Sequence, residues 1–132
     1  MSNYSVKIKS SSKELSTKER IRAKDLSDCV KLDKEISEDG EGIIIYPESY
    51  IVLEVHNEKS KNNPDYNNYV INDKDGTRYA TGSESFWRAF SDIWDEITDA
   101  ISDGEVEEWG IKAYKLPSKN YDGKTFITCS II

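Results

Sequence analysis

Two cysteines and one histidine are the side chains of this chain best suited to nucleophilic or metal chemistry. Cys29 and Cys129 lie far apart, and neither has a second cysteine or a histidine nearby to complete a metal-ligand cluster. A catalytic Cys–His pair would require His56 to meet a cysteine across the fold. We interpret His56 as a structural residue at a strand end. The sequence therefore predicts no disulfide scaffold, no metal site and no cofactor.

Carboxylates are abundant and unevenly distributed. The chain has 25 Asp and Glu against 18 Lys and Arg, a net charge of -7. Residues 1–34 carry +4 and the remainder -11, concentrated in Glu35–Glu41 and Asp92–Glu108. No histidine, nucleophile or Gly-rich phosphate loop accompanies these carboxylates, and Asp73–Gly76 lacks the remainder of a calcium loop. We expect a protein that is not an enzyme, in which the acidic helix face is either simply solvated or a docking surface.

Lysines and aromatic residues gather near the end of the chain, a combination that suits single-stranded nucleic acid. Bases stack on aromatic rings with about 1–3 kcal/mol each, and cations follow the phosphates. Alternation predicts that Lys112, Tyr114 and Phe126 point away from the buried side of two strands. The same residue types also occur on ordinary sheet surfaces. The candidate binding residues are Tyr69, Arg78, Lys112, Tyr114, Lys115, Lys119, Tyr121, Lys124 and Phe126.

The chain's size and apolar content indicate a compact protein outside the membrane. Its 132 residues fit one domain, and a hydrophobic fraction of 36% is enough for a core. The longest apolar run, Ile43–Tyr46, is far below the roughly 20 residues that span a bilayer. The N-terminus lacks the apolar stretch of a secretory signal, so we expect a cytoplasmic location.

Periodicity and turn residues predict the elements that position these side chains. A capping box at Ser16–Glu19 indicates a short helix, Pro47 predicts a bend in a long strand, and apolar spacings of three and four predict a long helix. The expected strands are 4–8, 30–36, 43–57, 68–72, 77–81, 109–116 and 125–132, and the expected helices are 20–25 and 83–101.

From residue 42 onward, the predicted order is that of an oligonucleotide/oligosaccharide-binding (OB) fold. We expect an α+β protein with an OB-like antiparallel five-stranded barrel and one helix between strands three and four. This assigns residues 42–132 to the barrel and residues 1–41 to an N-terminal arm or extra strands.

Three stretches also resemble small proteins of bacteriophages that infect Gram-positive bacteria: Tyr69–Gly76, Thr81–Trp87 and Pro117–Cys129. Some of those proteins are described as single-stranded DNA-binding proteins. The resemblance implies a non-catalytic protein that binds single-stranded DNA in the cytoplasm of the host cell. The alternative is an acidic phage protein that inhibits a host defence nuclease, with the carboxylates of 92–108 imitating phosphates.

The basic N-terminal segment has its own expected role. Lys18–Lys34 should lie against the acidic helix of its own or a neighbouring subunit, or contact phosphates directly. Val30, Leu32 and Ile36 would hold it by joining the sheet. A homo-oligomer is compatible with the first arrangement.

Overall fold

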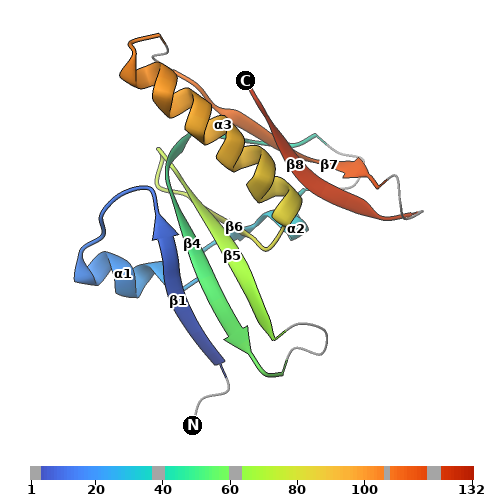
Figure 1. Cartoon of the computed structure of the whole chain (residues 1–132). Coiled ribbons are helices and arrows are strands. Elements are labelled where there is room, and N and C mark those ends of the chain that lie inside the picture. The colour runs from blue at the N-terminus through green and yellow to red at the C-terminus, as the bar shows by residue number, and fades with distance from the viewer. Residues whose placement is uncertain (1–3, 37–40, 60–63, 106–107, 119–122) are drawn as a thin grey trace. The chain divides into compact units, whose positions relative to one another are not determined.

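The computed structural model describes residues 4–36, 41–59, 64–105, 108–118 and 123–132 (Figure 1). The chain forms two compact units, each assembled from two stretches of sequence. Unit 1 comprises Met1–Leu32 and Pro47–Gly82, and unit 2 comprises Asp33–Tyr46 and Ser83–Ile132. The unit boundaries thus follow Leu32, Tyr46 and Gly82, whereas the sequence suggested a division after residue 41.

Unit 1 is built on a five-stranded sheet in the order β1-β4-β5-β6-β2. All neighbours are antiparallel except β2 and β6, which run parallel. The strands β1, β4 and β5 lie side by side in Figure 1. The predicted hairpin is confirmed, since β5 and β6 pair directly. The bounds are β1 Tyr4–Ser11, β2 Val30–Lys31, β4 Pro47–Asn57, β5 Asp65–Asp73 and β6 Arg78–Thr81.

The short helix α1, Thr17–Ala23, begins at the predicted capping box. Ser16 Oγ accepts a hydrogen bond from Glu19 N at 3.2 Å, and Glu19 Oε1 accepts one from Ser16 N at 3.1 Å. Both contacts satisfy amides that a helix start leaves unpaired. The helix buries Ala23 in the core of unit 1, which is formed by Ile51, Leu53, Val70 and Ala80 with Leu15 and Leu26 at its margin. α1 is therefore anchored to one face of the sheet.

The predicted strand over 30–36 is mostly wrong. Only Val30 and Lys31 pair with β6, and the chain then forms α2, Leu32–Glu35. Leu32 and Ile36 are both fully buried and lie four residues apart, which is the spacing of one helical turn. The three charged residues between them favour helix over strand.

Pro47 divides the predicted long strand between two sheets. The preceding strand β3, Ile43–Ile45, pairs with β7, whereas β4 begins at Pro47 and pairs with β1 and β5. The ladder between β4 and β5 shifts register between Pro47 and Ser49. Because proline has no amide proton to donate to a ladder, it suits this change of sheet. The predicted interruption at Pro47 is confirmed.

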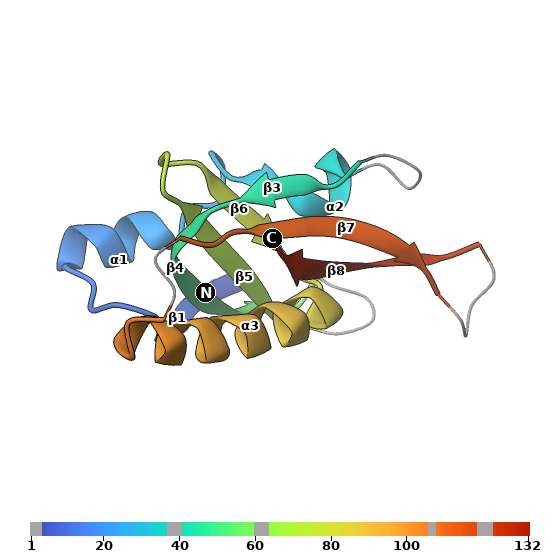
Figure 2. The ribbon, with the colours of Figure 1, turned by 90° about the horizontal axis from the view of Figure 1, so that it is seen from above.

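Unit 2 contains a three-stranded sheet in the order β3-β7-β8, with β7 at Ile111–Pro117 and β8 at Thr125–Ile131. The long helix α3, Glu84–Ser102, packs against β8, as Figure 2 shows from above. Ser83 caps its start by accepting from Phe86 N, and Gly104 follows its end with a positive φ of 78°. Phe86, Phe90 and Ile97 form its buried face. The apolar spacing of the helix also predicts that Trp94 is buried, and this is wrong, because Trp94 is only half-buried.

The α+β class is confirmed, and α3 follows the β5–β6 hairpin and precedes β7 as predicted. The strands form two separate sheets rather than one closed five-stranded barrel. Strand β1 extends the first sheet along β4, and β2 extends it along β6. Within the described residues, no helix is long and apolar enough to cross a membrane.

Candidate nucleic-acid interface

One face of the three-stranded sheet carries the lysine and aromatic residues singled out in the sequence. Lys112 pairs with Ser130, Tyr114 with Thr128, and Leu116 with Phe126. Residues that pair across a ladder point to the same face of the sheet, so these six side chains share one face. We call it the open face. The residues between them along each strand point to the other face. The predicted orientation of Lys112, Tyr114 and Phe126 agrees with this register. The open face consists of Ile44, Lys112, Tyr114, Leu116, Phe126, Thr128 and Ser130.

The open face exposes apolar and aromatic surface. Ile44 is 48% exposed, Leu116 40% and Phe126 38%, while Lys112, Tyr114 and Thr128 are half-buried. The hydroxyl groups of Tyr114 and Ser130 lie 2.7 Å apart and hydrogen-bond, which fixes the end of the Tyr114 ring. Tyr114 and Phe126 are diagonal neighbours across the β7–β8 ladder, a separation of about 7–8 Å. Both aromatic side chains therefore lie on the open face, and the hydroxyl of Tyr114 points toward Ser130, on the side of Thr128 away from Phe126.

The opposite face of the same sheet is apolar and closed. Ile45, Ile111, Ala113, Ile127 and Cys129 are all buried. This face fixes the strand register, because a slip by one residue would expose these side chains and bury the lysine and aromatic set. The core thus positions the open face.

An open groove of about 600 Å³ runs between α3 and β8 at the border of the open face. Ser85 Oγ donates a hydrogen bond to the Ile127 carbonyl at 2.7 Å and so attaches α3 to β8 at this place. Phe126 and Thr128 reach the groove from the sheet, and Arg88, Asp92 and Asp95 reach it from the helix. Neither aspartate makes an ion pair with any residue that the structure describes. Two carboxylates and one guanidinium therefore line this border of the open face, which leaves it with a net negative charge.

The remaining lysines of the predicted site lie around this sheet. Lys115 alternates to the other face, where its Nζ donates to the Asp33 carbonyl at 3.0 Å. Lys124 is exposed immediately before β8, close in sequence to Phe126. Lys112 has no ion pair within the described part of the chain. Lys119 and Tyr121 lie outside the described residues.

Tyr69 and Arg78 do not belong to this surface. Tyr69 is 1% exposed on the central strand β5, so its ring offers no face to a base. The Arg78 side chain, only 14% exposed, ion-pairs with Asp28 Oδ1 at 2.7 Å and donates to the carbonyls of Ala23 and Asp25. A central strand can be buried on both of its faces, and its sequence then shows no alternation of polar and apolar residues. The prediction that Tyr69 binds nucleic acid failed for this reason. Arg78 instead fixes the segment that follows α1.

His56 and the cysteines occupy separate surroundings. His56 Nδ1 lies 2.6 Å from Asp65 Oδ1, and Nε2 lies 3.5 Å from Glu58 Oε1. Its hydrogen bonds to Asp65 and then to Glu58 raise the His56 pKa. Burial raises the pKa of the Cys129 thiol to about 12, which keeps it protonated and unreactive. Among the described residues, no group of His, Cys, Asp and Glu is arranged to hold a metal ion.

Sequence reasoning missed the apolar part of the open face and its acidic border. Ile44 belongs to the apolar run Ile43–Tyr46 and Leu116 stands between Lys115 and Pro117, and the ladder places both outward. The approach of Asp92 and Asp95 to Phe126 depends on how α3 packs on β8, and no local pattern encodes that contact.

Comparison of the chain with protein-family models, with curated proteins and with solved structures gives no match. A function must therefore be argued from the residues of this chain.

Proposed function

We propose that this protein binds single-stranded DNA, without catalysis, on the open face of β3, β7 and β8. The observation that carries the proposal is that two aromatic residues, Tyr114 and Phe126, share one partly exposed sheet face with Lys112. Extended nucleic acid stacks its bases on such rings irrespective of sequence, because every base has a π-face. The binding should therefore show little base preference.

Lysines supply the charge that phosphates need. Lys112 shares the open face with Tyr114, and Lys124 precedes the strand that carries Phe126. Asp92 and Asp95 stand at the opposite border, on α3. Because opposite charges attract and like charges repel, the phosphate backbone is expected to pass along Lys112 and Lys124 and to avoid Asp92 and Asp95.

The OB-like barrel, the phage origin and the location in the host cytoplasm are further parts of this proposal. An OB-like barrel would require the two sheets to pair along an edge, and the ladders of the described residues contain no such pair. A phage origin and a place in the host cytoplasm rest on the resemblance of the three sequence stretches. Binding to the open face needs none of these assignments.

The proposal is tested by fluorescence anisotropy with a labelled oligo-dT of about 12 nucleotides, titrated at two salt concentrations. Affinity should fall as salt rises, with a log–log slope of about -0.7 per neutralised phosphate. Replacing Phe126 by Ala should weaken binding by about 1–3 kcal/mol, since a stacked base loses its platform. The double variant Lys112→Ala/Lys124→Ala should weaken binding and make the salt slope shallower.

The matched control is Lys59→Ala/Lys74→Ala, which removes the same charge from exposed turn lysines outside this surface. It should leave the affinity nearly unchanged. Equal losses in the two double variants would show that only net charge matters. No binding by the parent protein at low salt would refute the proposal.

A second function is favoured by one observation on α3. Asp92, Asp95 and Asp99 lie on its solvent side at helical spacing, and the described residues provide none of them with an ion pair. Such a row of carboxylates could imitate phosphates and dock on the basic groove of a host nuclease. In that case Asp92→Asn/Asp95→Asn/Asp99→Asn would abolish inhibition of the nuclease, whereas Phe126→Ala would not.

A further inference from the structure

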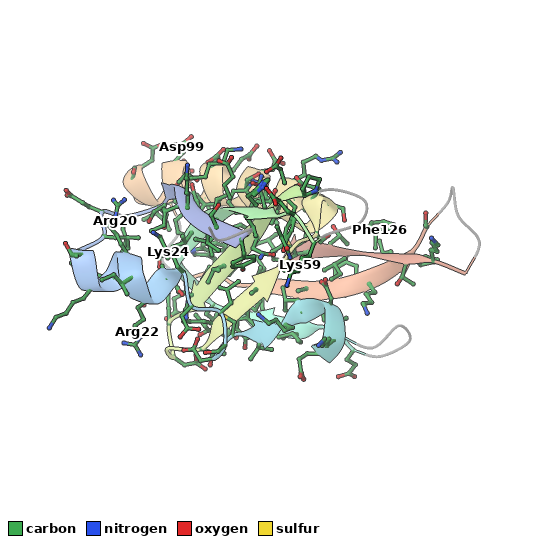
Figure 3. The ribbon with its side chains drawn as sticks, turned by 90° about the horizontal axis from the view of Figure 1, so that it is seen from below. Arg20, Arg22, Lys24, Lys59, Asp99 and Phe126 are labelled. Carbon is green, nitrogen blue, oxygen red and sulfur yellow. The ribbon has the colours of Figure 1, made fainter. Side chains whose placement is uncertain are left out.

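The helix α1 presents an exposed basic surface with an apolar centre. Ile21 is 68% exposed, although its neighbour Ala23 is buried against the sheet. Lys18 and Lys24 lie one turn before and after Ile21 and flank it on the same side. Arg20 and Arg22 project from the two sides of the helix (Figure 3). None of these four cations makes an ion pair within the part of the chain that the structure describes.

An exposed isoleucine among cations is unusual for a helix that contacts only water. Phosphates would be attracted by the lysines and arginines, but they gain nothing from Ile21. A protein surface with an apolar centre and a carboxylate border would contact both parts of α1. The basic surface of α1 therefore favours an acidic protein partner over nucleic acid.

The groove between α3 and β8 has the complementary chemistry. Ala89 and Phe126 provide apolar surface, and Asp92 and Asp95 provide exposed carboxylates without ion pairs among the described residues. The exposed Arg88 also lines the groove, so that two carboxylates outnumber one cation there. Asp99 follows Asp95 by one helical turn on α3 and is labelled in Figure 3. The groove is open, so that a side chain of the size of isoleucine can enter it from outside.

We propose that the surface around Ile21 on α1 docks into the α3–β8 groove of a second copy of this chain. Ile21 then packs near Phe126 and Ala89, while Lys18 and Lys24 pair with Asp92 and Asp95. The two surfaces differ, so the contact is heterologous and leaves one free α1 and one free groove in every dimer. Further copies can add head to tail. This inference goes beyond single-stranded DNA binding and does not depend on it.

The experiment is sedimentation velocity on the full chain, freed of nucleic acid, over a range of concentrations up to about 1 mM. The parent protein is expected to form dimers and longer assemblies. Lys18→Glu/Lys24→Glu and, separately, Asp92→Lys/Asp95→Lys place like charges across the contact, which should raise the dissociation constant by about tenfold or more. Lys59→Glu/Lys74→Glu changes the net charge as much as the first variant and should associate like the parent.

Mixing the two charge-reversed variants gives the decisive measurement. The acidic α1 of the first variant matches the basic groove of the second, and the unchanged α1 of the second matches the unchanged groove of the first. The mixture should therefore form assemblies that contain the two variants in equal numbers, although neither variant associates alone. The proposal is overturned if the parent is monomeric throughout, if association ignores both reversals, or if the mixture stays monomeric.

Discussion

The ion pairs of His56 give the surface of unit 1 a pH-dependent contact. Asp65 and Glu58 raise the folded-state pKa of His56 above its ordinary value of 6.5, which unfolding restores. The contact therefore stabilises the fold fully below pH 6.5, and this contribution is lost as pH rises through the folded-state pKa. The difference in melting temperature between the parent and His56→Gln should shrink between pH 5.5 and about pH 8. A difference that grows with pH would contradict the assignment.

The two thiols should differ in reactivity. Cys129 is buried with a pKa raised to about 12, whereas Cys29 is half-buried and its pKa is raised by burial to a smaller degree. At pH 8 a thiol reagent should modify Cys29 slowly and Cys129 only after unfolding, because the thiolate is the reacting species. The variant Cys29→Ser should then show no reaction in the native state and one full equivalent in denaturant. Rapid native modification of that variant would show that β8 opens readily.

At the scale of elements, the stability of α3 depends on its buried aromatic residues more than on its half-buried ones. Phe90 is fully buried, and its ring centroid lies 6.0 Å from that of Phe86 and 5.8 Å from that of Trp94. Phe90→Ala should lower the free energy of unfolding by about 3–5 kcal/mol. Trp94→Ala should cost clearly less, because solvent already reaches that side chain. Urea denaturation measures both, and a larger loss for Trp94 would contradict this packing.

Local sequence patterns predicted the helices and strands better than they predicted which strands pair with each other. The apolar spacing of α3, the capping box at Ser16 and the turn before β6 each depend on residues close in sequence, and all three are confirmed. The division of the strands into two sheets depends on the change of partner at Pro47, which involves ladders with distant segments. Sequence reasoning therefore predicted a bend there but not the two sheets.

The same distinction applies to the candidate site. Alternation along β7 and β8 correctly placed Lys112, Tyr114 and Phe126 on one face. It failed for Tyr69, because β5 is a central strand with buried positions on both faces. The groove beside Phe126 could not be predicted, since its carboxylates come from a helix whose packing is set by tertiary contacts.

At the scale of the whole molecule, the distribution of charge should control affinity for single-stranded DNA. Asp92 and Asp95 border the open face, whereas Asp99 and Asp103 lie beyond the groove. Asp92→Asn/Asp95→Asn should tighten oligo-dT binding by about twofold to tenfold at low salt, since each exposed pair of charges contributes about 0–1 kcal/mol. The control Asp99→Asn/Asp103→Asn removes the same net charge and should have a smaller effect. Equal effects of the two double variants would indicate that the affinity depends on net charge and not on the position of Asp92 and Asp95.

The central claim is that single-stranded DNA binds to the open face. Nuclear magnetic resonance of the isotope-labelled chain during titration with oligo-dT tests this claim most directly. The account predicts that the largest amide shift changes fall in Ile111–Pro117 and Thr125–Ile131, with smaller ones in Ile43–Ile45. The amides of β1 should change little. Saturating oligo-dT that leaves β7 and β8 unchanged, or that shifts mainly α1, would contradict it.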